Sequence, residues 1–467
     1  MRHKVVLYNP QAVFYTMPLG LLAVGSCLDP ERYDVRIIDA RLEDDPEAAV
    51  LAEIDDAVCL GMSVLTGRPI ADALGILRAA KARRPDLPTV WGGWHPSLFP
   101  TQCLDEPCLD YTVKGQGETS FRELVERLVD GQAADGISGV GFRQNGHVVF
   151  TDSAGLEDMD TFPPPDFGLI PVAKYFSLKG RRQLDYITST GCLFRCAFCA
   201  DPFVYNRGWS AVSPCRLADD IESLWQQYNF TDLNFQDETF FTYAHRVAEI
   251  SEEFLRRDMQ FTWAATMRAD QGVRLPEEIF DLCIRSGLRR VLIGVESGSP
   301  AVLERIMKDT TVDQVIAAAE MCAHHGVAVI FSFIVGFPGE GNDEVQETLD
   351  LVKRLRAMSS RFETPIFYYK PYPGSRLAQE VTADIPRTLD GWADFDYVAG
   401  AAGPWVSPQI YKLVERFKFY NRFAWGPQTA WRVPLQMIAR WRCQRDWYRM
   451  PLEKLVVECV KPSPRLS

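Results

Sequence analysis

The chain has 467 residues, of which 47% are hydrophobic and 24% are charged, so its composition is that of a globular protein with room for two to four domains. Its formal net charge of -12 argues against a general nucleic-acid-binding protein, because neutralising phosphates requires a basic surface. The N-terminal residues lack the features of a secretory signal, and no apolar run reaches the roughly 20 residues of a membrane-spanning helix. We therefore expect a cytoplasmic protein whose 12 cysteines stay reduced.

The first third of the chain alternates between strand-like and helix-like segments. Strands are expected near 4–10, 33–40, 57–65, 88–93 and 109–114, with helices near 18–28, 46–54, 70–84 and 119–131. The last of these helices has Thr119 as its expected N-cap and Gly131 at its C-terminal end. This alternation predicts an α/β fold, a doubly wound parallel sheet with a ligand at the carboxyl ends of its strands.

Small residues gather at those strand ends. Ser63 and Leu65 follow the third strand, Gly92 and Gly93 end the fourth, and a Gly-Gln-Gly-Glu segment follows the fifth. Each one alone is explained equally well by a tight turn, but together they favour a large ligand that approaches the backbone. A dinucleotide is disfavoured, because no Gly-x-Gly-x-x-Gly follows the first strand.

A hairpin and a proline-rich connector come next. Two alternating runs flank Asn145-Gly146, which is typical of a tight hairpin, and Pro163 to Pro165 form a stiff extended segment. We place a domain boundary near Ser153. The predicted organisation is a ligand-binding domain over 1–135, a hairpin and linker over 136–184, a second domain over 185–375 and a mainly helical region over 376–467.

The second domain again alternates strand and helix. Six such steps without antiparallel signals predict a partial parallel (β/α)6 barrel, with its chemistry at the carboxyl ends of the strands. The residues at these ends are the cysteine segment, Gln236 to Glu238, Arg268 with Asp270, Gly294 to Ser297 and Gly336 to Glu340.

Three cysteines follow the first strand of the second domain. Cys192, Cys196 and Cys199 lie within eight residues, and no fourth ligand is close by. Structural zinc prefers four closed ligands and a redox pair needs two thiols, so three thiolates favour a 4Fe-4S cluster with one open iron. Zinc and buried structural cysteines remain the alternatives, and a distant His95 or His245 could complete a metal site.

The C-x-x-x-C-x-x-C spacing, with Phe198 before the last cysteine, resembles the signature of radical S-adenosylmethionine enzymes. The resemblance covers about 185–375 and includes the segments "IGVESGSPAVLERIMKDTT" and "FIVGFPGE". It implies that the three cysteines hold the cluster, that Phe198 lies near the adenine of S-adenosylmethionine, and that Asp237 and Glu238 lie near its amino group. Arg268 and Glu296 would lie near the ribose or carboxylate. The usual Gly-Gly-Glu is replaced by Gln236-Asp237-Glu238, and the resemblance assigns no catalytic side chain.

The N-terminal domain is similar to the cobalamin-binding domain of one large subfamily of these enzymes. Ser63-x-Leu65 and Gly92-Gly93 are similar to elements that line the buried nucleotide tail of cobalamin. Asn9 to Leu19 contain no histidine, whereas proteins that ligate cobalt from below carry an Asp-x-His-x-x-Gly motif there. The resemblance therefore implies a lower cobalt face without a histidine ligand. We interpret His95 as a surface or capping residue.

The resemblance implies chemistry at an unactivated carbon. A 5'-deoxyadenosyl radical removes a hydrogen, and in the methylating members a methyl group passes from methylcobalamin to the substrate radical. A radical oxidation or cyclisation, as in the anaerobic magnesium-protoporphyrin ester cyclase, is the alternative, and a cobalamin-binding sensor is a third interpretation. The family also implies a flavodoxin or ferredoxin as electron donor.

The region from Arg416 to Arg449 reverses the charge of the chain. It holds eight basic residues among many aromatic ones, and Asp446 is the only acid between those two residues. A helical cap whose arginines extend along the barrel surface is one interpretation. The other is a surface for an anionic lipid headgroup, a membrane or a large apolar substrate such as a lipid or tetrapyrrole.

Overall fold

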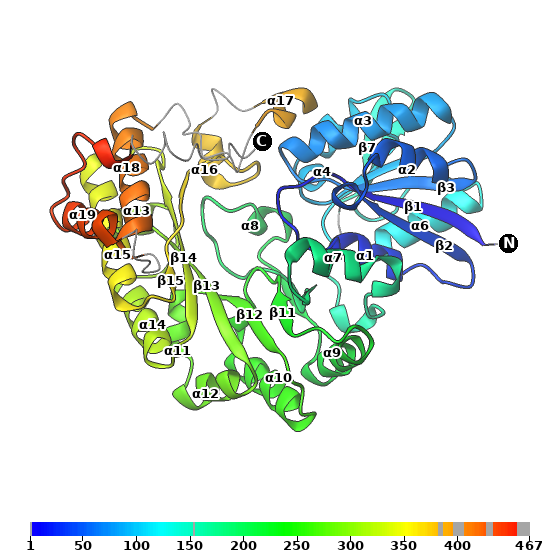
Figure 1. Cartoon of the computed structure of the whole chain (residues 1–467). Coiled ribbons are helices and arrows are strands. Elements are labelled where there is room, and N and C mark those ends of the chain that lie inside the picture. The colour runs from blue at the N-terminus through cyan, green and yellow to red at the C-terminus, as the bar shows by residue number, and fades with distance from the viewer. Residues whose placement is uncertain (1, 153–154, 382–385, 396–405, 426–432, 455–467) are drawn as a thin grey trace.

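The computed structural model describes residues 2–152, 155–381, 386–395, 406–425 and 433–454. Two largely parallel sheets with helices on their outer faces lie next to each other, the first in the blue to cyan part of the chain and the second in the green to yellow part (Figure 1). The predicted α/β class is confirmed. The described residues do not include Ser153, where the domain boundary is predicted, nor Trp431, Arg432 and Cys459 of the C-terminal region.

The first sheet has the strand order β2-β1-β3-β4-β5-β6-β7. Its strands are β1 (His3–Asn9), β2 (Tyr33–Asp39), β3 (Ala57–Ser63), β4 (Thr89–Gly92), β5 (Tyr111–Val113), β6 (Val140–Gln144) and β7 (His147–Phe150). The first five strands are parallel to one another. Because β2 pairs with one edge of β1 and β3 pairs with the other, the order in which strands are added changes direction between β1 and β3. In an open sheet of this order, the carboxyl ends of β1 and β3 form a crevice for a ligand.

Apolar side chains cover both faces of the first sheet. On one face, α1 (Leu19–Ser26) and α6 (Glu118–Val129) bury one cluster, and on the other α2 (Pro46–Glu53) and α3 (Arg68–Arg83) bury a second. The sequence did not predict the short helices α4 (Trp94–Leu98) and α5 (Pro100–Leu104), which have too few residues for a clear 3.6-residue pattern.

Two predictions about the first sheet are corrected. The hairpin β6–β7, expected within the linker, is the antiparallel edge of the sheet, because β6 pairs with β5 and Tyr111 lies opposite Phe142. Thr119 is not the N-cap of α6. The helix begins at Glu118, after Gly117, and the Thr119 hydroxyl instead donates a hydrogen bond to Glu157.

The second sheet forms an open, parallel barrel wall. Its strands are β8 (Gln183–Tyr186), β11 (Asp232–Phe235), β12 (Thr262–Met267), β13 (Leu288–Glu296), β14 (Ala328–Val335), β15 (Phe362–Glu363) and β16 (Ile366–Tyr368). They follow the order β8-β11-β12-β13-β14, and both β15 and β16 pair with β14. Within the described residues no pairing joins β8 to β16, so the barrel is partial, as predicted.

Helices cover the outside of this wall and bury a large core against it. They are α9 (Pro214–Tyr228), α10 (Ala244–Arg256), α11 (Ala269–Arg274), α12 (Glu277–Arg285), α13 (Pro300–Arg305), α14 (Val312–His324) and α15 (Asn342–Met358). Burial alternates along β14, so one face of the strand packs under the helices and the other faces the barrel interior. The sequence did not predict α7 (Val172–Lys179) or the antiparallel ribbon of β9 (Ser189–Gly191) and β10 (Trp209–Ala211).

The C-terminal helices divide between the two sheets. Both α18 (Pro408–Ala424) and α19 (Val433–Gln444) pack on the outside of the barrel beside α15, at the left of Figure 1. In contrast, α17 (Leu389–Ala393), which follows α16 (Arg376–Glu380), returns to the first unit, where Trp392 is buried beside α3. No helix among the described residues has both the length and the hydropathy to cross a bilayer.

Candidate cofactor sites

The cysteine segment is a loop between β9 and α8 (Asp201–Val204), fixed by backbone contacts. Gly191, immediately before Cys192, has a positive φ of 87°, and a Cβ there would collide with the carbonyl oxygen of Gly208. In the middle of the loop, the Ala197 N–H donates to Ile306 at 2.8 Å and the Ala197 carbonyl accepts from Leu377 at 2.9 Å. These backbone hydrogen bonds therefore hold the loop at the carboxyl ends of the barrel strands, and they do not involve the thiols.

The three thiols are half-buried and free of disulfides. Burial raises the pKa of Cys192 to about 11 and the pKa of Cys199 well above its ordinary value. Without a cation these thiols therefore stay protonated, whereas iron binds the thiolate, so loading would release protons. In the described part of the chain, no group of three His, Cys, Asp or Glu side chains, the three cysteines included, is arranged to hold a metal ion, and neither His95 nor His245 joins these thiols in such a group.

Arg268 provides a positive charge beside this loop. Its guanidinium lies 3.6 Å from the centre of the Phe194 ring and 3.7 Å from the Cys196 sulfur. Asp270 and the Lys308 carbonyl accept its other hydrogen bonds, at 2.9 and 2.6 Å. Arg268 is thus fixed in position, and its charge stabilises negative charge on the thiolates.

Asp237 and Glu238, which are adjacent at the end of β11, have different surroundings. The buried Asp237 carboxylate accepts hydrogen bonds from the Thr188 N–H, the Thr188 hydroxyl and the Ser189 hydroxyl, at 2.5–2.7 Å. Glu238 instead lines a cavity, and burial raises its pKa well above the ordinary value. Both carboxylates were predicted to lie near the amino group of S-adenosylmethionine. Asp237 is instead hydrogen-bonded to Thr188 and Ser189 of the protein, whereas Glu238 lines the cavity.

Glu296 and Phe198 both lie near the ammonium group of Lys308. The Glu296 carboxylate accepts a hydrogen bond from the Lys308 ammonium at 2.8 Å, and both side chains are buried. Glu296 has a φ of 69°, unusual for a residue with a Cβ, at an irregularity of β13. The Phe198 ring centre lies 5.8 Å from the Lys308 nitrogen and packs edge-on against Phe337.

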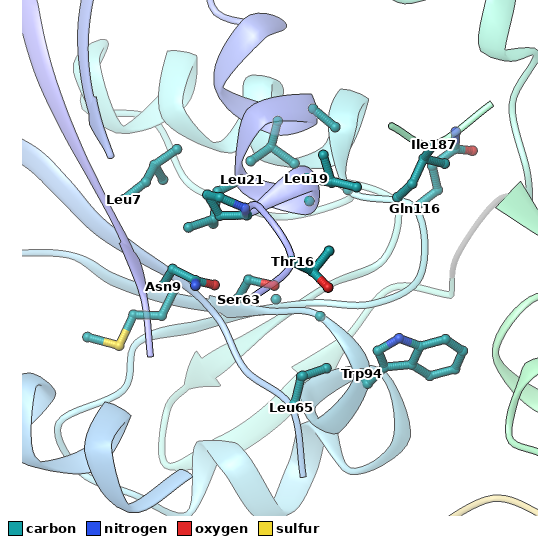
Figure 2. A pocket seen from close by; sticks show the side chains of 18 of the residues that line it. Leu7, Asn9, Thr16, Leu19, Leu21, Ser63, Leu65, Trp94, Gln116 and Ile187 are labelled. Carbon is teal, nitrogen blue, oxygen red and sulfur yellow. The ribbon is translucent and has the colours of Figure 1, made fainter. Parts of the chain in front are cut away.

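A cavity with a volume of about 650 Å³ lies between the two sheets. Asn9, Ser63, Leu65, Gly92 and Gly93 line it from the first unit, so all four residues of the predicted cobalamin elements are brought together there. Figure 2 shows Asn9, Thr16, Ser63 and Leu65 around this space, with Ile187 of the second unit opposite. From the second unit come Thr190, two residues before the first cysteine, and Tyr205, Gln236 and Glu238.

The wall formed by the first unit fits a large ligand. A Cβ on Gly92 would meet no atom closer than 3.8 Å, so this position leaves open space. Gly93 has a φ of 93°, and a Cβ there would come within 3.0 Å of Ser63 and Val64. The buried amide nitrogen of Gln116 on the same wall has no hydrogen-bond partner among the described residues. The residues present therefore fit cobalamin, whose peripheral amides offer the oxygen that this nitrogen lacks.

The segment after β1 reaches this cavity without a histidine, as the sequence indicates. None of the six histidines, all within the described residues, lines the cavity. The segment is instead fixed by Arg41, a cavity residue that no sequence motif marks: its guanidinium donates to the Phe14 and Thr16 carbonyls and pairs with Asp39 at 2.5 Å. The sequence carried no signal for Arg41, because its partners are backbone carbonyls distant in the chain.

His95 is a core residue, so its interpretation as a surface or capping residue is wrong. Its side chain is fully buried, with the ring centres of Phe99 and Trp392 at 5.6 and 5.7 Å. Its Nδ1 lies 3.1 Å from the Thr66 hydroxyl, and burial lowers the pKa of His95 to about 4. Trp392 comes from α17, and the sequence could not place that helix beside α4.

Two family models match the chain. The radical SAM superfamily matches residues 186–352, and the B12-binding domain matches residues 7–125. The first match contains the cysteine loop, Arg268 and Glu296, and the second contains the glycine-lined wall. The cofactors of this enzyme are therefore a 4Fe-4S cluster, S-adenosylmethionine and cobalamin.

The chain is similar in sequence to several known proteins. An uncharacterized methyltransferase of Pyrococcus horikoshii is 30% identical over 87% of this chain and 88% of its own. The anaerobic magnesium-protoporphyrin IX monomethyl ester cyclase of Rubrivivax gelatinosus is 28% identical over 74% of this chain and 63% of its own.

The cobalamin-dependent S-adenosylmethionine radical enzyme OxsB, solved with aqua-cobalamin and S-adenosylmethionine, has the same fold, with a TM-score of 0.67 and 23% identity over 90% of this chain and 62% of its own. This chain thus spans less than two thirds of the length of OxsB and of the cyclase. The match to the Pyrococcus protein over nearly all of both chains, together with the two family models, shows that the chain belongs to the cobalamin-binding radical S-adenosylmethionine enzymes.

Proposed function

We propose that the enzyme transfers a methyl group to an unactivated carbon of a small molecule. The observation that carries this proposal is the single cavity whose walls come from both cofactor domains. When bound, the cluster with S-adenosylmethionine supplies a radical that removes hydrogen from carbon, and cobalamin supplies the methyl group. A shared cavity supports transfer between them, because the substrate carbon has to be within reach of both.

The residues of the second unit hold and orient one side of this site. Cys192, Cys196 and Cys199 would hold the cluster, with Arg268 balancing its negative charge. Glu238 would accept a hydrogen bond from the amino group of S-adenosylmethionine, because its carboxylate faces the cavity. Asp237 is a positioning residue, since it fixes Thr188 and Ser189 at the start of the segment that leads to the cysteines.

The remaining contacts follow from the same geometry. Glu296, held by Lys308, would accept hydrogen bonds from the ribose hydroxyls, and the Phe198 ring would lie against the adenine. In the first unit, Ser63, Leu65, Gly92 and Gly93 would line the cobalamin nucleotide. The segment from Asn9 to Leu19, held by Arg41, would line the cobalamin site and contains no histidine.

The experiment is an anaerobic turnover of the reconstituted enzyme with cobalamin and methyl-deuterated S-adenosylmethionine. Mass spectrometry would follow 5'-deoxyadenosine and the label in lipid and tetrapyrrole extracts. Label in one extract component, formed together with 5'-deoxyadenosine, is the expected result and identifies the substrate class. An oxidised or cyclised product without label would replace methyl transfer by the second candidate, which the similarity to the ester cyclase favours. A cobalamin sensor would form no 5'-deoxyadenosine.

The partners and the location are part of the same proposal. A lipid-like or tetrapyrrole substrate would suit the cavity, whose wall is mostly apolar. A flavodoxin or ferredoxin would deliver the electron, and the cytoplasm would keep the cluster thiols reduced. The membrane contact predicted for the C-terminal region also stays a proposal, and the exposed residues of α19 are its structural basis.

A further inference from the structure

One side of α19 exposes apolar side chains. Ala439 and Cys443 are buried in the contact with the rest of the protein. On the outer side, Val433, Met437 and Trp441 are 42%, 67% and 47% exposed, and their spacing of four residues puts them in one row. A helix on a protein surface normally presents polar residues to water, so an exposed row of apolar residues is unusual.

The exposed apolar surface extends beyond this row. Ile438 is also exposed, and Trp447, in the turn after the helix, packs edge-on against Trp441 with ring centres 5.6 Å apart. We call Val433, Met437, Ile438, Trp441 and Trp447 the apolar face. A contiguous group with two tryptophans differs from the scattered exposed apolar residues of any protein surface, and such groups mark interaction sites.

Exposed arginines neighbour this face along the chain. Arg440, Arg445 and Arg449 are exposed and form no ion pair within the described residues, while Arg440 donates one hydrogen bond to the Ala424 carbonyl at 2.7 Å. The nearby acids are already neutralised: Asp446 pairs with Lys353 at 2.7 Å, and Glu453 pairs with the buried Arg442 at 2.8 Å. In a chain of net charge -12, this excess of cations calls for an anionic partner.

We propose that the apolar face and its three arginines dock the enzyme on an anionic lipid bilayer. Tryptophans favour the boundary between headgroups and acyl chains, and flexible methionines adapt to an irregular apolar layer. Arginines beside such residues pair with lipid phosphates. A second copy of the chain fits worse, because two such faces would bring their unpaired arginines together. Since no described helix can span a bilayer, the contact is peripheral.

The test is co-sedimentation of the reconstituted full-length enzyme with phosphatidylcholine vesicles, with or without about one third phosphatidylglycerol. The expected result is binding to the anionic vesicles and release at high salt. Replacing Met437 and Trp441 together by serine is expected to weaken binding about tenfold or more, which corresponds to the loss of two buried apolar side chains. Replacing Arg445 and Arg449 by glutamate is expected to abolish the preference for anionic vesicles.

Matched controls separate this role from folding. Val273, 47% exposed on α11, gives the control Val273→Ser, and the exposed Arg122 on α6 gives the control Arg122→Glu. Both are expected to bind vesicles like the parent enzyme, and all variants should keep its melting temperature. Equal binding to both vesicle types, unchanged binding of the double serine variant, or a dimer that the serine variant disperses without vesicle binding would each overturn the proposal. None of these readouts depends on the reaction catalysed.

Discussion

The two units form their halves of one cavity by different means. The first unit contributes open space and backbone, as at Gly92 and Gly93, while the second contributes polar side chains, as at Gln236 and Glu238. A wall made of space recognises the shape of a large ligand, whereas polar side chains recognise particular groups. The difference explains why the cysteine pattern is a far more specific signal than the cobalamin elements.

The largest expected effect concerns the cysteine loop of the second unit. Replacing Cys196 by alanine removes one of three thiolate ligands, so we expect iron loading and cleavage of S-adenosylmethionine to be lost completely. The measurement is iron and sulfide content with a 5'-deoxyadenosine assay. The exposed Cys215 on α9 gives the control Cys215→Ala, which should behave like the parent. A Cys196→Ala variant that still makes 5'-deoxyadenosine would refute the cluster assignment.

The second prediction distinguishes the roles of the adjacent carboxylates Asp237 and Glu238. Glu238→Gln should weaken binding of S-adenosylmethionine about tenfold or more while keeping the melting temperature, because a charge-assisted hydrogen bond is lost from a cavity wall. Asp237→Asn should instead lower the stability by about 3 kcal/mol, because its buried charge faces Arg246 and three donors. Calorimetric titration measures the binding of S-adenosylmethionine by Glu238→Gln, and urea unfolding measures the stability of Asp237→Asn. A reversed pattern would exchange the roles of these residues.

A substitution in the open wall should affect only cobalamin. Gly92→Leu fills space that the structure leaves free, so cobalamin retention should fall about tenfold while the iron content is unchanged. The measurement is the absorbance of bound cobalamin after gel filtration. Gly75→Leu, at a position with no atom within 4 Å of an added Cβ, is the control. Normal cobalamin content in Gly92→Leu would remove the basis for this wall as the cobalamin site.

The last prediction concerns the pH dependence of the first unit. Because burial lowers the folded-state pKa of His95 to about 4, below the unfolded value of about 6.5, the neutral ring stabilises the fold above pH 6.5. This stability is lost as the pH falls toward 4. Between pH 7 and pH 5 we expect a loss of about 2 kcal/mol, measured by urea unfolding. His95→Gln should flatten this dependence, and an equal slope in both proteins would exclude His95 as its source.

Much of the fold was predictable because it rests on local periodicity. The alternation of strands and helices predicted both sheets, and the cysteine spacing predicted the loop for which a cluster is proposed. The misses depended on contacts between distant segments: the hairpin pairs with β5, His95 is buried by Trp392, and Arg41 binds carbonyls more than 20 residues away. Asp237 and Glu238 are both acids at a strand end, and only the three-dimensional surroundings distinguish them.

The return of α17 to the first unit means that the two units are joined twice along the chain. The linker before β8 makes one connection, and the burial of Trp392 beside His95 and Phe99 makes the other. If a protease cuts only the linker, the apolar contact of Trp392 with His95 and Phe99 therefore favours continued association of the two fragments. The same tether raises the effective concentration of each cofactor domain at the other, so the cavity can reassemble after local opening without a diffusional search.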